Sequence, residues 1–219
     1  MSETFEIARK NMVINQLRPN KINEENILNI FQNTPKENYL DVSLGKNCYL
    51  DKDLNITDKR GYLKNLHLAQ IIKYSEILPN DKVLHIGGLT GYFSTLISSL
   101  CEELHVVEEN KELFKSLEQN IKNIDNTNIQ LFNHKLLNGL DDKAPFNLII
   151  IDGPIFKISD NLKQQLVTNG GRLVYIKKIY DNLGKAYKIV RNEDLYSSEY
   201  LFDVMSTYQI QDKEEGFNF

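Results

Sequence analysis

Residues 83–96 constrain the fold more than any other stretch of this chain, because an apolar strand pattern runs directly into a glycine-rich loop and then into a helical pattern. Their sequence is VLHIGGLTGYFSTL. Glycine has no Cβ atom, so it allows a tight turn and a close approach of the backbone to a ligand. The glycines of this loop are Gly87, Gly88 and Gly91. Such a loop ends at a helix N-terminus, where free backbone N–H groups receive polar ligand groups.

Strand and helix patterns alternate along the second part of the chain. Short apolar runs, typical of parallel strands that are buried on both faces, recur with room for a helix between them. We expect strands at 83–86, 104–107, 129–132, 146–152 and 172–176. We expect helices at 93–100, 113–124 and 159–167. This alternation predicts an α/β fold with a doubly wound, mostly parallel sheet.

The C-terminal part of the chain has a different pattern. Residues 185–191 and 198–207 predict a closing β-hairpin. Asn169, Gly170 and Gly171 are typical of a turn.

Residues 1–78 predict an N-terminal cap of helical and irregular chain, and residues 79–219 predict the ligand-binding domain. Helical spacing occurs at 3–18, 23–33 and 65–78, with Arg18 and Pro19 joining the first two helices and Asn23 as a helix N-cap. The intervening residues 36–62 carry no strong periodicity, so we expect an irregular segment there.

Charge argues against a nucleic-acid partner. The 219 residues, 41% of them hydrophobic, suffice for one good core, and the formal net charge is −4 with a pI near 5.6. A nucleic-acid surface usually needs a clustered basic face. The one basic cluster, Lys177 and Lys178, follows a strand and is typical of a solvated edge.

Membrane, disulfide and metal signals are also missing from the sequence. No run approaches the roughly 18 apolar residues of a membrane span, and the polar first residues lack the apolar centre of a signal peptide. We therefore expect a cytoplasmic protein without a membrane partner. Cys48 and Cys101 are too few for a disulfide framework, so we expect free thiols. The four histidines lack ligand spacing, and we expect no metal.

In a doubly wound sheet, ligands bind beyond the carboxyl ends of the strands. This rule brings four regions of the chain together at one edge of the predicted sheet. They are residues 87–91, Glu108 at the end of the second strand, residues 134–136, and Asp152 with Gly153.

Several longer segments resemble one known family. They are MVINQLRPNKINEENILNIFQNTPKENYL at 12–40, APFNLIIIDG at 144–153 and LKQQLVTNGGRLVYI at 162–176. Together with the glycine loop and the acid that closes the second strand, they resemble the protein-L-isoaspartate O-methyltransferase family. The tail at 201–219 is similar to an alphaproteobacterial branch of that family.

This resemblance implies a Rossmann-like class I methyltransferase fold, with residues 79–219 as the domain that binds S-adenosylmethionine. It implies methyl transfer to an isoaspartyl carboxylate in damaged proteins, so the partner is a protein or peptide that bears isoaspartate. The number of subunits is not readable from the sequence.

The resemblance also assigns site residues. Glu108 is expected to accept hydrogen bonds from the two ribose hydroxyls, and Asp152 is expected to lie between cofactor and acceptor as a catalytic candidate. The expected cofactor-binding set is His85, Gly87, Gly88, Leu89, Gly91, Glu108, Glu109, Lys135, Asp152 and Gly153. Glu108 as a surface acid and Asp152 as a turn cap remain alternatives. Arg60 and Lys64 are candidates to attract an anionic acceptor, or are ordinary solvated charges.

The chain departs from the family pattern at several positions. His85 and the pair His134–Lys135 stand where the family has acids, and Leu89 stands where it has a glycine. Leu63 occupies the position of the family serine in a T-I-S-x-P phrase, so it is a catalytic position without its hydroxyl. These departures keep two alternatives open: a methyltransferase-like binding or scaffold protein without catalysis, and a methyltransferase with another carboxylate acceptor.

Overall fold

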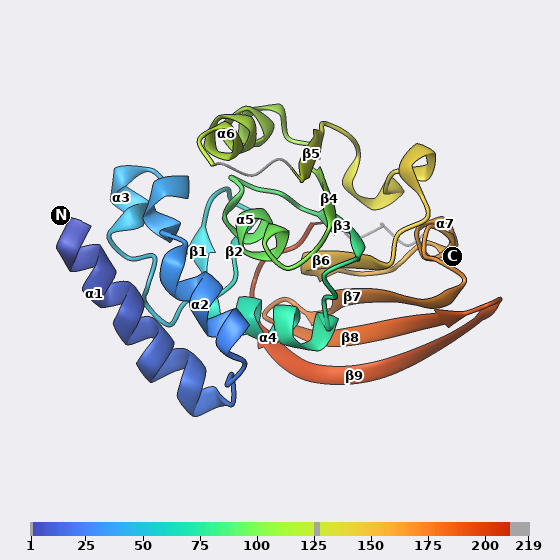
Figure 1. Ribbon diagram of the computed structural model, residues 1–219, viewed down its shortest axis with the longest axis horizontal. Helices are drawn as coiled ribbons and strands as arrows, with labels where there is room; N and C mark the ends of the chain where they lie inside the picture. Colours follow the sequence, from blue (N-terminus) through green and yellow to red (C-terminus); the bar gives the residue numbers. More distant parts are fainter. Residues whose placement is uncertain (1, 125–127, 211–219) are drawn as a thin grey trace, which may run out of the picture.

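A seven-stranded sheet forms the centre of the molecule in the computed structural model, which describes residues 2–124 and 128–210 (Figure 1). The part of the family-like tail beyond residue 210 therefore lies outside the described residues. Across the sheet the strand order is β5-β4-β3-β6-β7-β8-β9. The strands are β3 (Lys82–Ile86), β4 (Glu103–Val107), β5 (Ile129–Phe132), β6 (Leu148–Ile155), β7 (Asn169–Tyr180), β8 (Leu183–Asn192) and β9 (Leu195–Met205).

Five neighbouring strands, β5 to β7 in the sheet order, pair in parallel, and β7, β8 and β9 pair antiparallel. This arrangement confirms the predicted doubly wound, mostly parallel sheet and its C-terminal hairpin. The chain begins the sheet at β3 and adds strands first on one side and then on the other. The reversal lies between β3 and β6, which is where a doubly wound sheet offers a ligand crevice.

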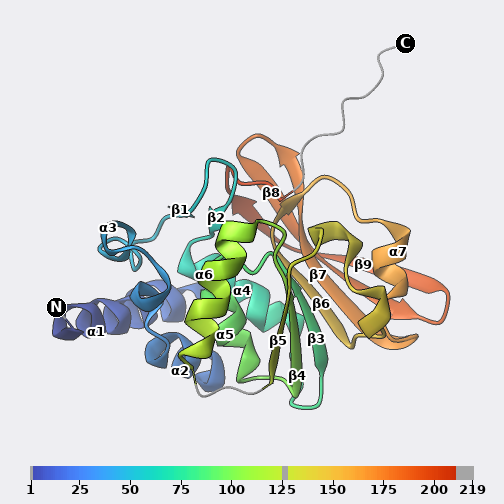
Figure 2. The ribbon, with the colours of Figure 1, turned by 90° about the horizontal axis from the view of Figure 1, so that it is seen from above.

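Helices cover both faces of the sheet (Figure 2). On one face lie α4 (Asn65–Ser75), α5 (Tyr92–Ser98) and α6 (Lys111–Lys122), and α7 (Asp160–Gln164) lies on the other. Successive strand residues point to opposite faces, so Val83 belongs to the core under α5 and Leu84 to the core under α7. The alternation of the strand side chains thus builds two apolar layers.

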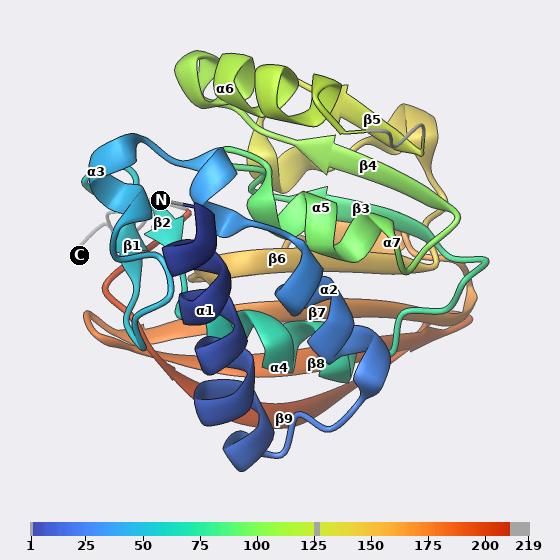
Figure 3. The same ribbon diagram turned by 60° about the vertical axis from the view of Figure 1, so that its left-hand side comes forward.

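The N-terminal cap, predicted at residues 1–78, includes α4 and packs beside α5 (Figure 3), where Phe31 contacts Tyr92 edge-on. It contains α1 (Ser2–Met12), a π-helical turn (Val13–Leu17), a 3₁₀ turn (Arg18–Asn20), α2 (Glu25–Asn33), a 3₁₀ turn (Lys36–Tyr39), α3 (Val42–Gly45), β1 (Leu54–Asn55) and β2 (Gly61–Tyr62). Buried cap side chains such as Leu17, Phe31 and Leu63 share one apolar cluster with Val83 and Leu96 of the sheet domain. The division at residue 78 stays a prediction.

Residues 3–18 are helical, as predicted, with π geometry after Met12. Several other local predictions are wrong. The N-cap position of α2 is Glu24 rather than Asn23. Residues 36–62 contain short elements instead of only irregular chain. The helix expected to reach 78 ends at Ser75, because Glu76 adopts a left-handed conformation with φ of 50°.

The predicted turn at Asn169–Gly171 is also wrong, because these residues begin β7 and pair with β8. A register shift interrupts this pairing around Gly170, whose φ is 77°. The glycine therefore accommodates an irregularity inside a long strand, where a local pattern of Asn and Gly resembles a turn.

No helix of the described residues is long and apolar enough to cross a membrane. Cys48 and Cys101 are buried free thiols, as expected. Within residues 2–124 and 128–210, side chains of His, Cys, Asp and Glu form no group of three that would hold a metal ion.

Candidate functional site

The carboxyl ends of β3, β4 and β6 bring the predicted regions together. Gly87 and Gly88 donate their backbone N–H groups to the carbonyl of Val107 at 3.0 and 3.2 Å, which joins the glycine loop to the end of β4. Asp152, near the end of β6, lies against Gly87, since a Cβ on that glycine would be 3.1 Å from Asp152 Oδ1. The regions that the topological rule grouped therefore lie together at one edge of the sheet, and their role in binding stays a prediction.

The glycine loop has the backbone conformation that its sequence suggested. Gly87 and Gly91 have φ values of 105° and 102°, in the region that favours glycine. A Cβ on Gly88 would lie 2.8 Å from side-chain atoms of Leu117 and Val106, so this glycine also permits close packing. Leu89 has φ of 48° and is 3% exposed. A branched side chain thus occupies a left-handed position, at which the resemblance implies a glycine.

Glu108 is fully buried, and its carboxylate is fully hydrogen-bonded. Oε1 accepts from Arg60 Nη1 at 2.7 Å and from the N–H of Asn110 at 2.9 Å. Oε2 accepts from Arg60 Nη2 at 2.7 Å and from the N–H of Leu89 at 3.0 Å. A carboxylate offers about four acceptor positions, so none is left for another donor. The alternative of an ordinary surface acid is therefore wrong.

Arg60 was expected to be an acceptor-attracting or solvated cation, but it is a bidentate partner of Glu108. It lies in the turn between β1 and β2, where its carbonyl accepts from the N–H groups of Ile56 and Thr57 at 3.1 and 2.8 Å. Burial by itself lowers the pKa of Arg60, but the hydrogen bonds and charge of Glu108 outweigh burial and raise it. The arginine therefore stays charged. Its partner lies 48 positions away in the chain, so no local sequence pattern indicated the pair.

Side chains fill the space beside this pair. The cavity at the end of the strands has a volume of about 10 Å³, whereas ligand pockets usually measure roughly 300–1,000 Å³. Ile210 covers two glycines of the cavity, since its Cδ1 lies 3.3 Å and 2.7 Å from the positions of a Cβ on Gly87 and Gly153. The cavity is lined by Arg60, Gly61, Gly87, Leu89, Asp152, Gly153, Tyr208, Gln209 and Ile210.

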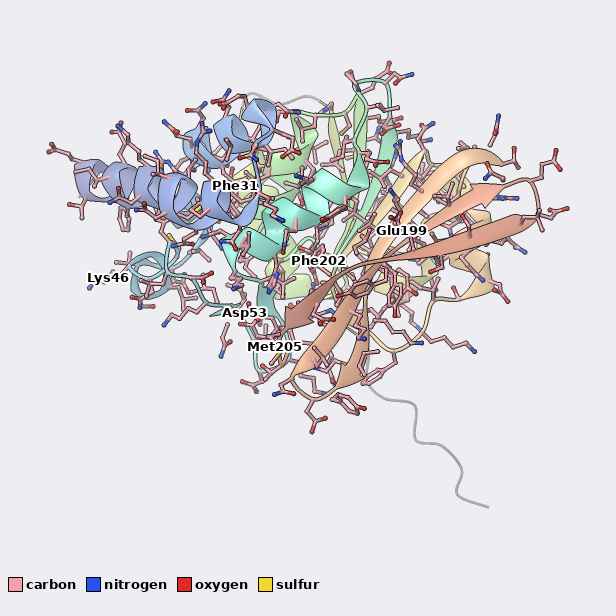
Figure 4. All side chains as sticks on the ribbon, turned by 90° about the horizontal axis from the view of Figure 1, so that it is seen from below. Phe31, Lys46, Asp53, Glu199, Phe202 and Met205 are labelled. Atoms are coloured by element: carbon pink, nitrogen blue, oxygen red, sulfur yellow. The ribbon has the colours of Figure 1, made fainter. Side chains whose placement is uncertain are left out.

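Ile210 belongs to a segment that we call the C-terminal strap, residues 206–210, which leaves β9 and crosses the site. Its backbone is attached to neighbouring segments: the N–H of Gln209 donates to Lys59 O and that of Ile210 to Pro154 O, both at 2.9 Å, and that of Ser206 donates to Asn182 O at 3.0 Å. Figure 4 labels Met205, at the end of β9 just before the strap, and Asp53 of the cap, which line one pocket together. The strap therefore joins the hairpin, the cap and the end of β6.

Lys178 holds the strap from β7. Its Nζ donates to the carbonyl oxygens of Thr207 and Tyr208 at 2.9 and 2.8 Å, and the residue is 6% exposed. The predicted solvated edge is thus wrong for Lys178 and correct for the exposed Lys177. Strand alternation explains the difference, because neighbouring residues face opposite sides.

His85 lies beneath Asp152 inside the sheet. Its Nδ1 is 2.9 Å from Ser94 Oγ, and its Nε2 is 3.5 Å from Asp152 Oδ1. His85 is fully buried, and it packs edge-on against Phe93. It adjoins Asp152, which lines the cavity, and any contact between His85 and a ligand stays a prediction.

The rim of the site on the β5 side is polar. Glu109 Oε2 accepts from the N–H of Leu136 at 3.3 Å, and Glu109, His134 and Lys135 are exposed. Glu109 lies beyond the end of β4, and His134 and Lys135 belong to the segment that follows β5. Contact of Glu109 or Lys135 with a cofactor stays a prediction.

Apolar and aromatic residues surround Leu63, the position that the resemblance assigns to the acceptor side. Leu63 is 1% exposed and belongs to the main core. The neighbouring Tyr62 was not predicted as a site residue, yet its hydroxyl contacts the glycine loop. Lys64, the other candidate for an anionic acceptor, pairs with Asp51 at 3.3 Å.

The chain is similar to proteins of one family over most of its length. A family model described as Protein-L-isoaspartate(D-aspartate) O-methyltransferase matches residues 8–205. The protein-L-isoaspartate O-methyltransferase of Shewanella woodyi is 30% identical over 199 residues, which cover 91% of this chain and 92% of the relative. That of Koribacter versatilis is 29% identical over 170 residues, which cover 78% of this chain and 76% of the relative.

The fold is shared with a solved structure of a protein-L-isoaspartate O-methyltransferase. The two superpose with a TM-score of 0.77 and 16% sequence identity over 92% of this chain, which spans 65% of the length of that one. This similarity confirms the Rossmann-like methyltransferase fold that the sequence implied.

Proposed function

The chain belongs to the protein-L-isoaspartate O-methyltransferase family, and from this premise we propose that it transfers a methyl group from S-adenosylmethionine to the carboxylate of isoaspartyl residues in damaged proteins. The observation that carries the proposal is the position of Glu108, whose buried carboxylate lies at the end of β4 and is hydrogen-bonded to the glycine loop. The enzyme would act in the cytoplasm, with no nucleic-acid or membrane partner.

The residue types around this edge fit the cofactor. Glu108 would accept the ribose hydroxyls, the glycines of residues 87–91 would admit the methionine part, and Glu109 and Lys135 would lie near the adenine. Asp152 and Gly153 would separate cofactor from acceptor, with His85 and Leu89 contributing from β3 and the loop. The fit requires that Arg60 and Ile210 leave the cavity, because they fill it in the structure.

S-adenosylmethionine supplies an electrophilic methyl group on a sulfonium. The protein then has to hold a carboxylate oxygen in line with that group. An isoaspartyl carboxylate with an ordinary pKa of about 4 is already ionised at neutral pH, so no general base is needed. Positioning of two reactants contributes up to roughly 7–11 kcal/mol in favourable cases. The cap would form the wall of the acceptor site, and Leu63 there leaves no side-chain hydroxyl to orient the carboxylate.

A second candidate is a methyltransferase-like binding or scaffold protein without catalysis. The observation that favours it is the closed site: Arg60 takes two acceptor positions of Glu108, and the remaining cavity measures about 10 Å³. Such a cavity holds about one water molecule at most. Methyl transfer to a carboxylate other than isoaspartate is a third possibility.

Calorimetric titration with S-adenosylhomocysteine, followed by a methylation assay on isoaspartyl and matched aspartyl peptides, separates these functions. We expect micromolar binding that Glu108→Ala abolishes, and transfer to the isoaspartyl peptide alone. Binding with no transfer to either peptide would support another acceptor. No binding at millimolar ligand would support the scaffold protein. Thermal unfolding of Glu108→Ala, measured alongside, verifies that this variant is folded.

A further inference from the structure

We propose that Arg60 is an internal competitor for the ribose site, held in place by the C-terminal strap, and that the cofactor enters only by exchanging with it. The inference rests on the proposed function and adds a residue that controls access to the cofactor site. Arg60 and the strap residues Tyr208, Gln209 and Ile210 line one cavity with the glycine loop.

All four acceptor positions of the Glu108 carboxylate are occupied by donors of the protein itself. Its bonds from Leu89 and Asn110 come from backbone N–H groups and belong to the fold of the loop itself. The other two come from Arg60, one to each oxygen, both at 2.7 Å. The guanidinium presents two parallel N–H donors, and a ribose presents two neighbouring O–H donors. The two groups therefore use the same pair of acceptor positions and exclude each other.

The side chain of Arg60 reaches solvent, whereas that of Glu108 does not. The side chain of Arg60 is 11% exposed and that of Glu108 is 0% exposed. The arginine lies on a short turn, whereas the glutamate ends a strand inside the parallel sheet. The charges of Asp152 and Glu109 also act on Arg60, so a displaced guanidinium still has acidic groups nearby. Exchange thus requires movement of the turn and leaves the sheet in place.

The C-terminal strap and the turn that carries Arg60 are attached to each other. Gln209 donates its N–H to the carbonyl of Lys59, the residue before Arg60. A Cβ on Gly61, the residue after Arg60, would lie 2.6 Å from Tyr208 Cζ. Ile210 covers Gly87 and Gly153 in the same cavity. Movement of Arg60 out of the site is therefore coupled to movement of the strap.

Binding of S-adenosylhomocysteine to the wild type and to Arg60→Ala tests the proposal. When only a fraction of molecules is open, the apparent dissociation constant equals the intrinsic constant divided by that fraction. Removal of the competitor should lower it by roughly tenfold or more. The gain should vanish for the 2′,3′-dideoxy analogue, which lacks the two competing hydroxyls. Arg18→Ala, which removes an exposed pair with Glu25, is the control and should leave affinity unchanged.

Arg60→Ala leaves the buried carboxylate of Glu108 without its cationic partner, so this variant can fail to fold. Two further measurements test the proposal without it. Ile210→Ala keeps the Arg60–Glu108 pair and opens the strap, so it should also bind more tightly. In the wild type, the ligand should accelerate hydrogen exchange at the N–H of Gln209 and Ile210, since both lose their acceptors. Protection or no change at these N–H groups would overturn the proposal.

The outcomes distinguish a failure of the Arg60 proposal from a failure of the proposed methyl transfer. Wild-type binding that Arg60→Ala leaves unchanged or weakens overturns the competitor and leaves methyl transfer intact. Binding by Arg60→Ala alone supports the competitor and shows that the wild-type site is held shut. If neither protein binds at millimolar ligand, both proposals are wrong.

Discussion

The hydroxyl of Tyr62 lies 2.9 Å from Oγ1 of Thr90, so a residue of the cap directly contacts the glycine loop. The same oxygen accepts hydrogen bonds from the backbone N–H groups of Thr90 and Tyr92 at 3.2 and 3.1 Å. These donors lie at the start of α5, where the first N–H groups of a helix have no partner within the helix. The cap therefore completes the helix terminus that would receive the cofactor.

Tyr62→Phe should destabilise the protein by about 1–3 kcal/mol, because it leaves buried N–H groups without an acceptor. Equilibrium unfolding in urea measures this free energy. Tyr180→Phe is the control, since Tyr180 is 69% exposed and its variant should unfold like the wild type. Equal stability of the two variants would contradict a structural role for the Tyr62 hydroxyl.

Leu89→Gly should be at least as stable as Leu89→Ala. At most positions glycine is the less stable of the two, but a left-handed backbone costs a residue with a Cβ roughly 1–2 kcal/mol. Leu89 has φ of 48°, so glycine relieves this strain. Thermal unfolding of both variants tests the order. The glycine variant should also bind S-adenosylhomocysteine more tightly than the wild type, because it removes a side chain that lines the cavity.

The contribution of Lys36 to the free energy of unfolding should increase as the pH rises above about 8. Burial lowers its pKa to about 8, and its Nζ donates to Asn65 Oδ1 at 2.9 Å beside the rings of Tyr62 and Tyr92. An unfolded lysine keeps a pKa near 10.4. Between these values the unfolded chain binds more protons, so the free energy of unfolding rises with pH, by at most about 3 kcal/mol. Below pH 8 both states are protonated, and this contribution is constant.

Urea unfolding of wild type and Lys36→Met between pH 7 and 9.5 tests this dependence. The difference in stability between the two proteins should change with pH in favour of the wild type, while other titrating groups cancel in the difference. Lys46→Met, at an exposed lysine, should run parallel to the wild type. A pH-independent difference between wild type and Lys36→Met would mean that Lys36 has an ordinary pKa.

Lys178→Met should loosen the strap and strengthen cofactor binding, because Lys178 Nζ holds the carbonyls of Thr207 and Tyr208. We expect a several-fold lower dissociation constant for S-adenosylhomocysteine by calorimetry. Lys177→Met is a matched control on the adjacent, exposed residue, and its affinity should equal that of the wild type. If the two variants bind alike, the anchoring of the strap does not limit access.

The sequence by itself determined the sheet and the edge at which Glu108 and Asp152 meet. Apolar runs and the glycine loop are local patterns, and parallel strands bring their carboxyl ends to one edge, so Glu108 and Asp152 converge by topology alone. Only the tertiary structure decided what these carboxylates contact. Arg60 and Ile210 reach the site from a turn and from the strap, which have no periodic pattern, and Lys178 holds the strap from β7. Contacts between distant segments depend on register and side-chain direction, which a local pattern does not encode.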